Sequence, residues 1–214
     1  EMCIRDRINI MNLDNKVIRR AKVYVNQLLI PLEQHYYHQY SHALEVMDRA
    51  VYLGKKEWLN DDDIEVLAIA GLFHDTWFII QYDDNEPIWA KIAQNYLKSM
   101  LYDRDKIQLI EEIILATAPS YKNPKNIYEQ IIIDSDLDNF WREDFFDKME
   151  NIHRERETIK NIKLLDPDWK HWVIDFLAEH KYFTKTQKVE RNTQKEKNMT
   201  ELEKMVQELE NEEI

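Results

Sequence analysis

The stretch Gly71-Leu-Phe-His-Asp-Thr-Trp-Phe78 decides the fold that this chain of 214 residues can adopt. Val66 to Phe73 is an unbroken apolar run, and the polar residues before it can cap a helix that begins near residue 61. A helix that is apolar on every side is a buried helix. His74 and Asp75 come directly after it, and burying an imidazole beside a carboxylate is costly unless both are satisfied. A metal ion satisfies both, because it binds a neutral imidazole and an ionised carboxylate together.

Composition limits the class of protein. The chain has only 2 Gly and 5 Pro, and long helical periodicities lie between them, so we expect an all-α fold. The formal net charge of −12 argues against a partner that is a nucleic acid polymer or an anionic membrane, since both require a basic face. Cys3 is the only cysteine, which leaves no disulfide within the chain and no thiolate zinc site. No apolar run approaches a membrane span and no secretory signal is visible, so we expect a cytoplasmic protein.

We expect three segments along the chain. Residues 1–10 fit poorly with the rest of the chain and are interpreted as a non-native or disordered extension, because Met11 looks like a natural start. Residues 11–185 form the expected domain. Its predicted helices cover residues 15–30, 41–53 (closed near Gly54), 61–76, 87–102, 107–117, 127–140, 143–163 and 167–180.

Residues 186–214 are predicted to form a charged helical tail. Leu202, Met205, Val206 and Leu209 make one apolar stripe at helical spacing, and the rest of this segment is strongly polar. Such a stripe packs either on the domain or on a second copy of the chain, which would make the protein a homo-oligomer. Partial disorder of the tail is the alternative.

The predicted helix over 127–140 carries three aspartates, of which one is expected to face the core. Asp136 falls on the apolar arc with Ile132 and Ile133, whereas Asp134 and Asp138 fall roughly opposite. By itself, a carboxylate at such a position is more often a buried acid paired with Arg or Lys. Whether Asp136 is a metal ligand therefore depends on the other candidate ligands.

A second candidate ligand lies at the edge of the apolar arc of the 41–53 helix. This residue is His42, and on its own it is more often a rim histidine than a metal ligand. His38 lies one turn earlier, at a spacing that allows two histidines to bind one metal. Taken together, His42, the pair His74-Asp75 and Asp136 come from three helices. Two imidazoles and two carboxylates form a mixed set that suits a divalent ion.

Three segments of the chain resemble a known family. Tyr40-Ser-His42, Leu72-Phe-His-Asp75 and Asp134-Ser-Asp-Leu137 are similar to the H…HD…D signature of the HD-domain metal-dependent phosphohydrolase superfamily. The likeness covers roughly residues 35 to 185 and implies a helical bundle around a central metal site. By motif position the ligands would be His42, His74, Asp75 and Asp136, in agreement with the inward position of Asp136.

The resemblance also implies a chemistry. One divalent ion (Mn, Mg, Fe, Co, Ni or Zn) would lower the pKa of a bound water and bind a phosphoryl oxygen, and the resulting hydroxide would attack phosphorus. Asp75 would then be both ligand and catalytic residue. Some family members carry a histidine-glutamate pair where this chain has Asn85-Glu86, and others a histidine soon after the position of Thr117, which here precedes Ala-Pro-Ser. These departures favour one metal ion and count against the di-iron oxygenase branch.

Other polar residues are candidates for accessory roles. Glu86 could orient or deprotonate water, or be a solvated loop acid; His38 could contact a substrate phosphate, or lie at the rim of the site. Arg49, Lys122 and Arg142 are candidate phosphate-binding residues, although each could equally be an ordinary surface cation.

The sequence thus predicts a metal-dependent phosphohydrolase that cleaves a small phosphomonoester or phosphodiester, a nucleotide being the expected substrate. Two alternatives remain open. One is a non-catalytic HD-fold protein that binds a nucleotide or metal for signalling, and the other is a metal-dependent oxygenase on the same fold.

Overall fold

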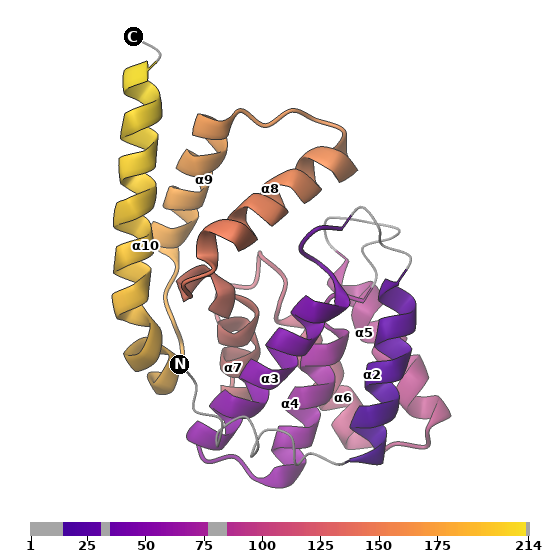
Figure 1. Ribbon diagram of the computed structural model, residues 1–214. Helices are drawn as coiled ribbons and strands as arrows, with labels where there is room; N and C mark the ends of the chain where they lie inside the picture. Colours follow the sequence, from indigo (N-terminus) through magenta and orange to yellow (C-terminus); the bar gives the residue numbers. More distant parts are fainter. Residues whose placement is uncertain (1–14, 31–34, 77–84, 213–214) are drawn as a thin grey trace. The chain divides into compact units, whose positions relative to one another are not determined.

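The computed structural model describes residues 15–30, 35–76 and 85–212. These residues form helices and no strand, which confirms the predicted all-α fold. The elements, with the labels of Figure 1, are α2 (Lys16–Leu29), α3 (Tyr40–Lys56), α4 (Asp61–Phe73), α5 (Glu86–Ser99), α6 (Arg104–Leu115), α7 (Ile127–Asp136), the 3₁₀ helix η1 (Asp138–Trp141), α8 (Phe145–Lys160), α9 (Asp166–Glu179) and α10 (Lys185–Glu212).

The described chain divides into two compact units. The first unit contains α2 to α7 and runs from the start of the described chain to Asp136. The second unit contains η1 and α8 to α10, together with the short segment 35–37. The predicted extension at 1–10 lies outside the described residues, and the predicted boundary at residue 185 stays a prediction.

Helix α4 is the core of the first unit. Ile64 and every residue from Val66 to Phe73 are buried, and α4 packs against α2, α3, α5, α6 and α7. Figure 1 shows α4 beside α3, its main partner. A helix buried on all sides needs no polar face, so the structure confirms the interpretation of the apolar run.

Local signals at the start of α4 explain where it begins. Asn60 accepts a hydrogen bond through its side chain from the backbone N–H of Asp63 at 3.0 Å, and the Asp63 carboxylate accepts one from the Asn60 N–H at 3.4 Å. This reciprocal pair is a capping box. Asp61, Asp62 and Asp63 also place negative charge in the first turn, where the helix dipole favours it.

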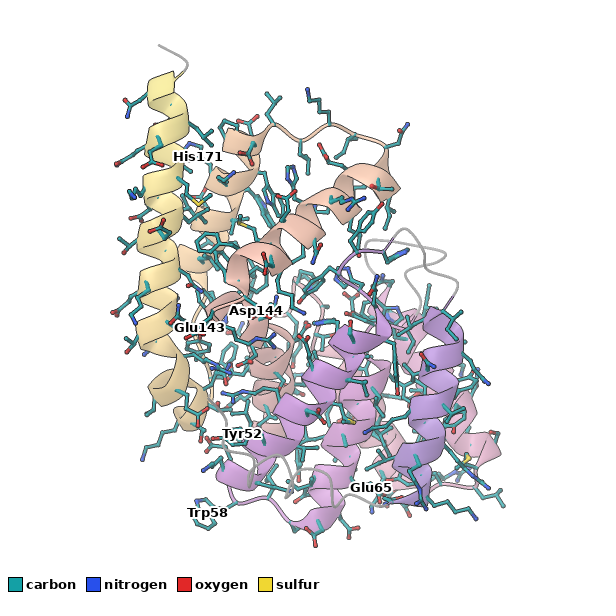
Figure 2. All side chains as sticks on the ribbon, in the orientation of Figure 1. Tyr52, Trp58, Glu65, Glu143, Asp144 and His171 are labelled. Atoms are coloured by element: carbon teal, nitrogen blue, oxygen red, sulfur yellow. The ribbon has the colours of Figure 1, made fainter. Side chains whose placement is uncertain are left out.

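The prediction that α3 closes near Gly54 is wrong. Gly54 is buried inside the helix, which continues to Lys56. A Cβ at this position would lie 2.9 Å from the Ile64 side chain, so the glycine permits close packing of α3 on α4 instead of ending the helix. The chain leaves the helix through Trp58, a residue with φ of 65° whose side chain is 93% exposed (Figure 2).

The predicted helix over 127–140 is also corrected. Helix α7 ends at Asp136, and the chain continues as η1 from Asp138 to Trp141. The regular 100° rotation per residue therefore stops at Asp136, and Asp138 belongs to an element with a different period. The break also coincides with the boundary between the two units.

In the second unit, α10 packs along α9 and against η1 (Figure 1). Leu202 and Val206 of the predicted apolar stripe are buried, while Met205 and Leu209 are half-buried. Arg191 of α10 also forms a double ion pair with Asp138 of η1, with N···O distances of 2.8 and 3.0 Å. The stripe therefore packs within its own chain, and contact with a second copy stays a prediction.

Membrane insertion through a helix has no support in the described part of the chain. None of its helices combines the length and the apolar character that a membrane span requires.

Candidate metal centre

Three elements of the first unit deliver four candidate ligands to one point. His42 lies in the first turn of α3, His74 and Asp75 come directly after α4, and Asp136 is the last residue of α7. One ligand atom from each of the four residues lies within 4.8 Å of the others. We call this group, His42, His74, Asp75 and Asp136, the HHDD cluster.

The distances inside the HHDD cluster are short and regular. His42 Nε2 lies 3.2 Å from Asp75 Oδ2 and 3.2 Å from Asp136 Oδ1. His74 Nε2 lies 3.0 and 3.2 Å from the same two oxygens. The two Nε2 atoms are 3.3 Å apart.

These distances match neighbouring ligands of one cation. Ligands about 2.1 Å from a divalent ion are separated by about 3.0 Å at the edges of an octahedron and about 3.4 Å at those of a tetrahedron. The observed separations of 3.0 to 3.3 Å fall in this range. The donor set of two neutral imidazoles and two carboxylates suits a divalent transition metal or magnesium. The residues present therefore fit a divalent ion.

The orientation of His74 supports the same conclusion. Its Nδ1 donates a hydrogen bond to the carbonyl oxygen of Gly71 at 2.8 Å. Because Nδ1 keeps its proton for this bond, Nε2 is the nitrogen that faces the HHDD cluster, where a cation would replace any proton on it. His74 is fully buried and its ring cannot turn without breaking this bond.

Gly71 contributes to the centre in a second way. A Cβ at Gly71 would lie 2.9 Å from Met47 Cα and 3.0 Å from Met47 N, both backbone atoms of α3. Only a glycine allows α3 and α4 to approach this closely, and that approach brings His42 to His74. No role for Gly71 was predicted from the sequence. Its position in the middle of a buried helix, in a chain with only 2 glycines, was the available signal.

Electrostatic interactions in the cluster separate the pKa values of its acids and bases. Burial by itself lowers the pKa of His74, but the charges of Asp75 and Asp136 outweigh it and raise that pKa well above its usual value. Burial raises the pKa of Asp136, yet the charge of His74 and hydrogen bonds to both imidazoles bring it down to about 2. The pKa of Asp75 is lowered in the same way. The carboxylates are thus ionised at neutral pH, as metal ligands must be.

The predicted arrangement of the three aspartates is partly wrong. Asp136 does join the HHDD cluster, but Asp134 and Asp138 do not face solvent: their side chains are 0% and 5% exposed. The prediction assumed that this helix has one buried side, whereas α7 packs against α3, α4 and α6. Asp138 lies beyond the end of α7, and Arg191 satisfies its charge.

The two predicted accessory residues, His38 and Glu86, lie in different parts of the chain. The His38 ring is 5.9 Å from the His42 ring, and its charge helps to lower the pKa of Asp75, so it lies beside the HHDD cluster. Glu86 is 6% exposed in the first turn of α5, which rules out a solvated loop acid. Catalytic roles for both residues stay predictions.

The three predicted phosphate-binding residues lie in three different parts of the chain. Arg49 is half-buried on α3 with its guanidinium 4.9 Å above the Tyr52 ring, and Lys122 is exposed in the loop between α6 and α7. Arg142 belongs to the second unit, where its Nε donates to Asp144 at 2.8 Å. Substrate binding by these residues stays a prediction.

Comparison with protein families bears directly on this geometry. Residues 40–140 match the family described as HD domain, and this segment includes all four residues of the HHDD cluster. This segment of the chain is therefore similar to HD domains. The matched segment is shorter than the resemblance seen in the sequence, which extended from roughly residue 35 to 185. Neither the curated proteins nor the solved structures yield a match to the chain.

Proposed function

We propose that this HD-domain protein is a metal-dependent phosphohydrolase that cleaves a small phosphomonoester or phosphodiester. The observation that carries the proposal is the convergence of the HHDD cluster within the HD domain, with donor separations that match the ligand shell of one divalent ion. A divalent ion bound there would supply two things: a bound water of lowered pKa and a positive charge for a phosphoryl oxygen.

The residues of the chain supply the remaining requirements. His42 and His74 offer Nε2 lone pairs, and the carbonyl of Gly71 holds His74 in the tautomer that leaves its lone pair available. Asp75 and Asp136 supply two negative charges, which leave a divalent ion formally neutral and able to accept an anionic phosphate ester. Burial of His42, His74 and Asp75 lowers the local dielectric and strengthens each of these interactions, while Asp136 is partly exposed.

His38 is the neighbouring group that we assign to the substrate. It lies next to His42 but outside the HHDD cluster, and its imidazole can donate a hydrogen bond to a phosphate oxygen. Glu86 is the second accessory residue, for which we propose the orientation or deprotonation of the attacking water. A nucleotide is the substrate we propose, since the net charge of −12 disfavours a polyanionic polymer as substrate.

Phosphate release in the presence of added metal tests the proposal. Wild-type protein is incubated with Mn²⁺, Mg²⁺, Fe²⁺, Co²⁺, Ni²⁺ or Zn²⁺ and with a panel of nucleotides and sugar phosphates. Asp75→Ala should abolish any release, because it removes a ligand that also balances the charge of the ion. The matched control is Asp105→Ala, which removes the same group from an exposed position of α6 and should leave the rate unchanged.

Metal content measured on the same samples separates the possible results. Release that depends on metal and on Asp75 supports the proposal. Stoichiometric metal binding without phosphate release from any substrate would favour a non-catalytic binding protein. Release that Asp75→Ala does not reduce would place the reaction outside the HHDD cluster and contradict the assignment.

A further inference from the structure

Helix α2 stands out from the rest of the molecule by its charge. Its sequence, KVIRRAKVYVNQLL, contains four cations and no acidic residue, although the whole chain has a net charge of −12. Each of the other α-helices that the structure describes contains at least one Asp or Glu. Helix α2 therefore has a formal charge of +4 from its four cations, within an acidic protein.

Three of these cations occupy an unfavourable part of the helix. Lys16, Arg19 and Arg20 lie within the first two turns of α2, where the helix dipole already places positive charge. Lys16 and Arg20 are also four residues apart, a spacing at which like charges repel. The arrangement costs local stability, and a bound anion would offset that cost.

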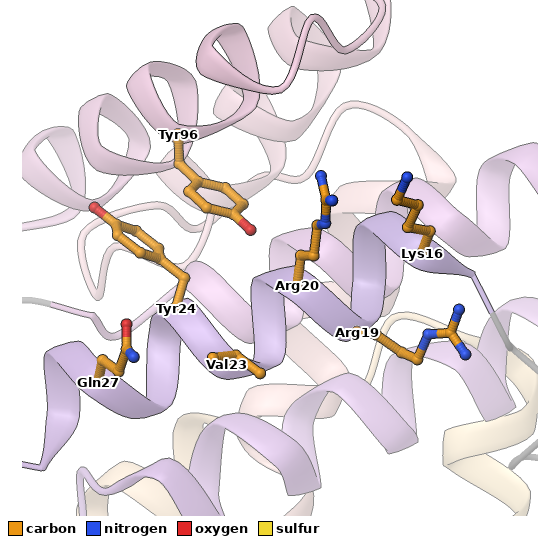
Figure 3. A pocket seen from close by; sticks show the side chains of 7 residues that line it. All are labelled: Lys16, Arg19, Arg20, Val23, Tyr24, Gln27 and Tyr96. Carbon is orange, nitrogen blue, oxygen red and sulfur yellow. The ribbon is translucent and has the colours of Figure 1, made fainter.

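The same cations line an open pocket between α2 and α5. Figure 3 shows its lining, in which Lys16 and Arg20 extend from α2 on the side of Tyr96 of α5. Arg19 extends from a different side of α2, at the edge of the pocket. We call this site the α2–α5 pocket; it is lined by Lys16, Arg19, Arg20, Val23, Tyr24, Gln27 and Tyr96.

Two tyrosines form the wall of the pocket next to the cations. The rings of Tyr24 and Tyr96 stack with their centroids 4.3 Å apart and an interplanar angle of 14°. Burial raises the pKa of Tyr96, and the charge of Arg20 acts against this increase. The Arg20 guanidinium therefore lies near the Tyr96 hydroxyl, so a guanidinium and a phenol can donate hydrogen bonds to the same ligand.

The donors of the two key cations are available to a ligand. Arg20 donates to the Met100 sulfur at 3.8 Å, and a thioether is a weak acceptor that occupies one of five guanidinium N–H groups. Within the described part of the chain, neither Lys16 nor Arg20 forms an ion pair. Both side chains are exposed.

We propose that the α2–α5 pocket binds a phosphorylated small molecule, with its phosphate groups on Lys16, Arg19 and Arg20. Arginine matches phosphate through two parallel hydrogen bonds, and lysine adds a point charge. The pocket continues along α2 to Val23 and Gln27, an apolar and an uncharged polar side chain. The ligand therefore has a phosphate end and an uncharged body, as a nucleotide has.

This site is separate from the HHDD cluster, since none of the four cluster residues lines it. The inference does not depend on the proposed hydrolysis. It predicts a second place at which a phosphorylated compound binds the protein, whether or not the HHDD cluster is catalytic.

Calorimetric titration of the full chain with α,β-methylene-ADP, which resists cleavage between its phosphates, tests the proposal. Adenosine serves as the uncharged probe. The key variant is Lys16→Gln with Arg20→Gln, and the matched control is Lys197→Gln with Lys204→Gln, which removes two exposed lysines from α10. Glutamine is a good helix former, so we expect both variants to fold, which circular dichroism would verify.

We expect the analogue to bind and adenosine not to bind. The Lys16/Arg20 variant should weaken binding at least about tenfold, and the control should stay within about twofold of wild type. Asp75→Ala should leave this binding event in place. Binding that disappears in Asp75→Ala but survives in the Lys16/Arg20 variant would assign the ligand to the HHDD cluster and overturn the proposal. A DNA oligonucleotide that binds more tightly through the same two residues would overturn the small-molecule assignment.

Discussion

At the residue scale, Asp136 belongs to the HHDD cluster and Asp134 does not. Asp136→Asn should remove the metal from the HHDD cluster, because asparagine has nearly the same shape but supplies no negative charge to the cation. Both imidazoles would also lose the carboxylate that raises their pKa values. Elemental analysis of protein purified without chelator should show about one metal ion per wild-type chain and a large loss in this variant.

Asp134→Asn is the matched comparison, two residues away on α7. Its side chain is fully buried but is not part of the HHDD cluster. We therefore expect this variant to retain its metal while its free energy of unfolding falls by about 1–3 kcal/mol, the range for a disturbed buried polar group. Equal loss of metal from both variants, at equal folded yield, would show that Asp134 also acts at the centre.

His180 should make the free energy of unfolding depend on pH, independently of any metal. Both nitrogens of its ring lack a hydrogen-bond partner among the described residues, and the ring packs on Trp141 and Tyr182. Burial, and then the charge of Lys195, lowers the pKa of His180 to about 3. In the unfolded chain this pKa returns to about 6.5, so the unfolded state binds an extra proton between these values.

The pKa of His180 is lower in the folded than in the unfolded state, and this difference sets the direction in which stability changes with pH. His180 destabilises the fold as the pH falls below about 6.5, and the effect is complete near the folded-state pKa. His180→Phe keeps an aromatic ring and should reduce the loss of unfolding free energy between about pH 7 and about pH 4.5, measured by urea denaturation. His171→Phe, at an exposed position of α9, is the control. An unchanged pH profile in His180→Phe would mean that this ring is protonated in the folded protein.

Single residues also show why the site was predictable and its surroundings were not. Adjacent His74 and Asp75 at the end of an apolar run pointed to a metal, because few other groups satisfy both when buried. The burial of Asp134 could not be read from the sequence. It depends on α7 having neighbours on several sides, which a wheel drawn for one helix does not contain.

At the scale of elements, the close approach of α3 and α4 places two of the four candidate ligands. Gly71→Ala would set a methyl group 2.9 Å from the Met47 backbone, and backbone cannot rotate away. We expect a loss of about 1–3 kcal/mol in unfolding free energy, together with weaker metal binding, because His42 and His74 would be forced apart.

Gly54→Ala is the control for this prediction at the same helix interface. Its new methyl group would meet Ile64 Cδ1 at 2.9 Å and Leu67 Cδ1 at 3.0 Å, the ends of flexible side chains. These atoms can shift, and alanine favours the helix over glycine by about 1 kcal/mol. The variant should be close to wild type in stability and in metal content. A Gly71→Ala protein that behaves like Gly54→Ala would show that α3 and α4 separate without cost.

The first and last residues of the helices show which local sequence signals are sufficient to predict where a helix begins or ends. The capping residues of α4 and the proline in the first turn of α5 and of α9 fixed the starts of these helices to within a residue or two. Gly54 was misleading, since a glycine that ends a helix and a glycine that allows close packing look the same in a sequence. The end of α7 gave no signal, because the residues after Asp136 continue an apolar pattern into η1.

At the scale of the whole molecule, the two units share one chain but hold different features. All four residues of the HHDD cluster and the α2–α5 pocket belong to the first unit. The apolar core of the second unit includes Trp141, Phe145 and Leu202, and α10 contributes to it. The sequence located the cluster but could not show this division, since no linker rich in Gly, Pro or Ser separates the units.

Removal of residues 191–214 should therefore affect the two units differently. The truncation deletes Arg191 and with it the positive charge beside the buried carboxylate of Asp138, at a cost of up to about 3–5 kcal/mol, while the hydrogen bond from Gln187 to that carboxylate is kept. It also deletes Leu202 and Val206 from buried positions. We expect the second unit to unfold at a lower temperature than in the full chain, while metal binding in the first unit is retained.

Calorimetry and elemental analysis of the truncated and full-length proteins test this expectation. The control is removal of residues 207–214 alone, which preserves the Arg191–Asp138 ion pair and both buried side chains and should shift the transition little. A truncated protein that loses its metal together with its second unit would show that the two units unfold as one cooperative body. In that case the end of α7, where Asp136 meets η1, transmits the stability of α10 to the HHDD cluster.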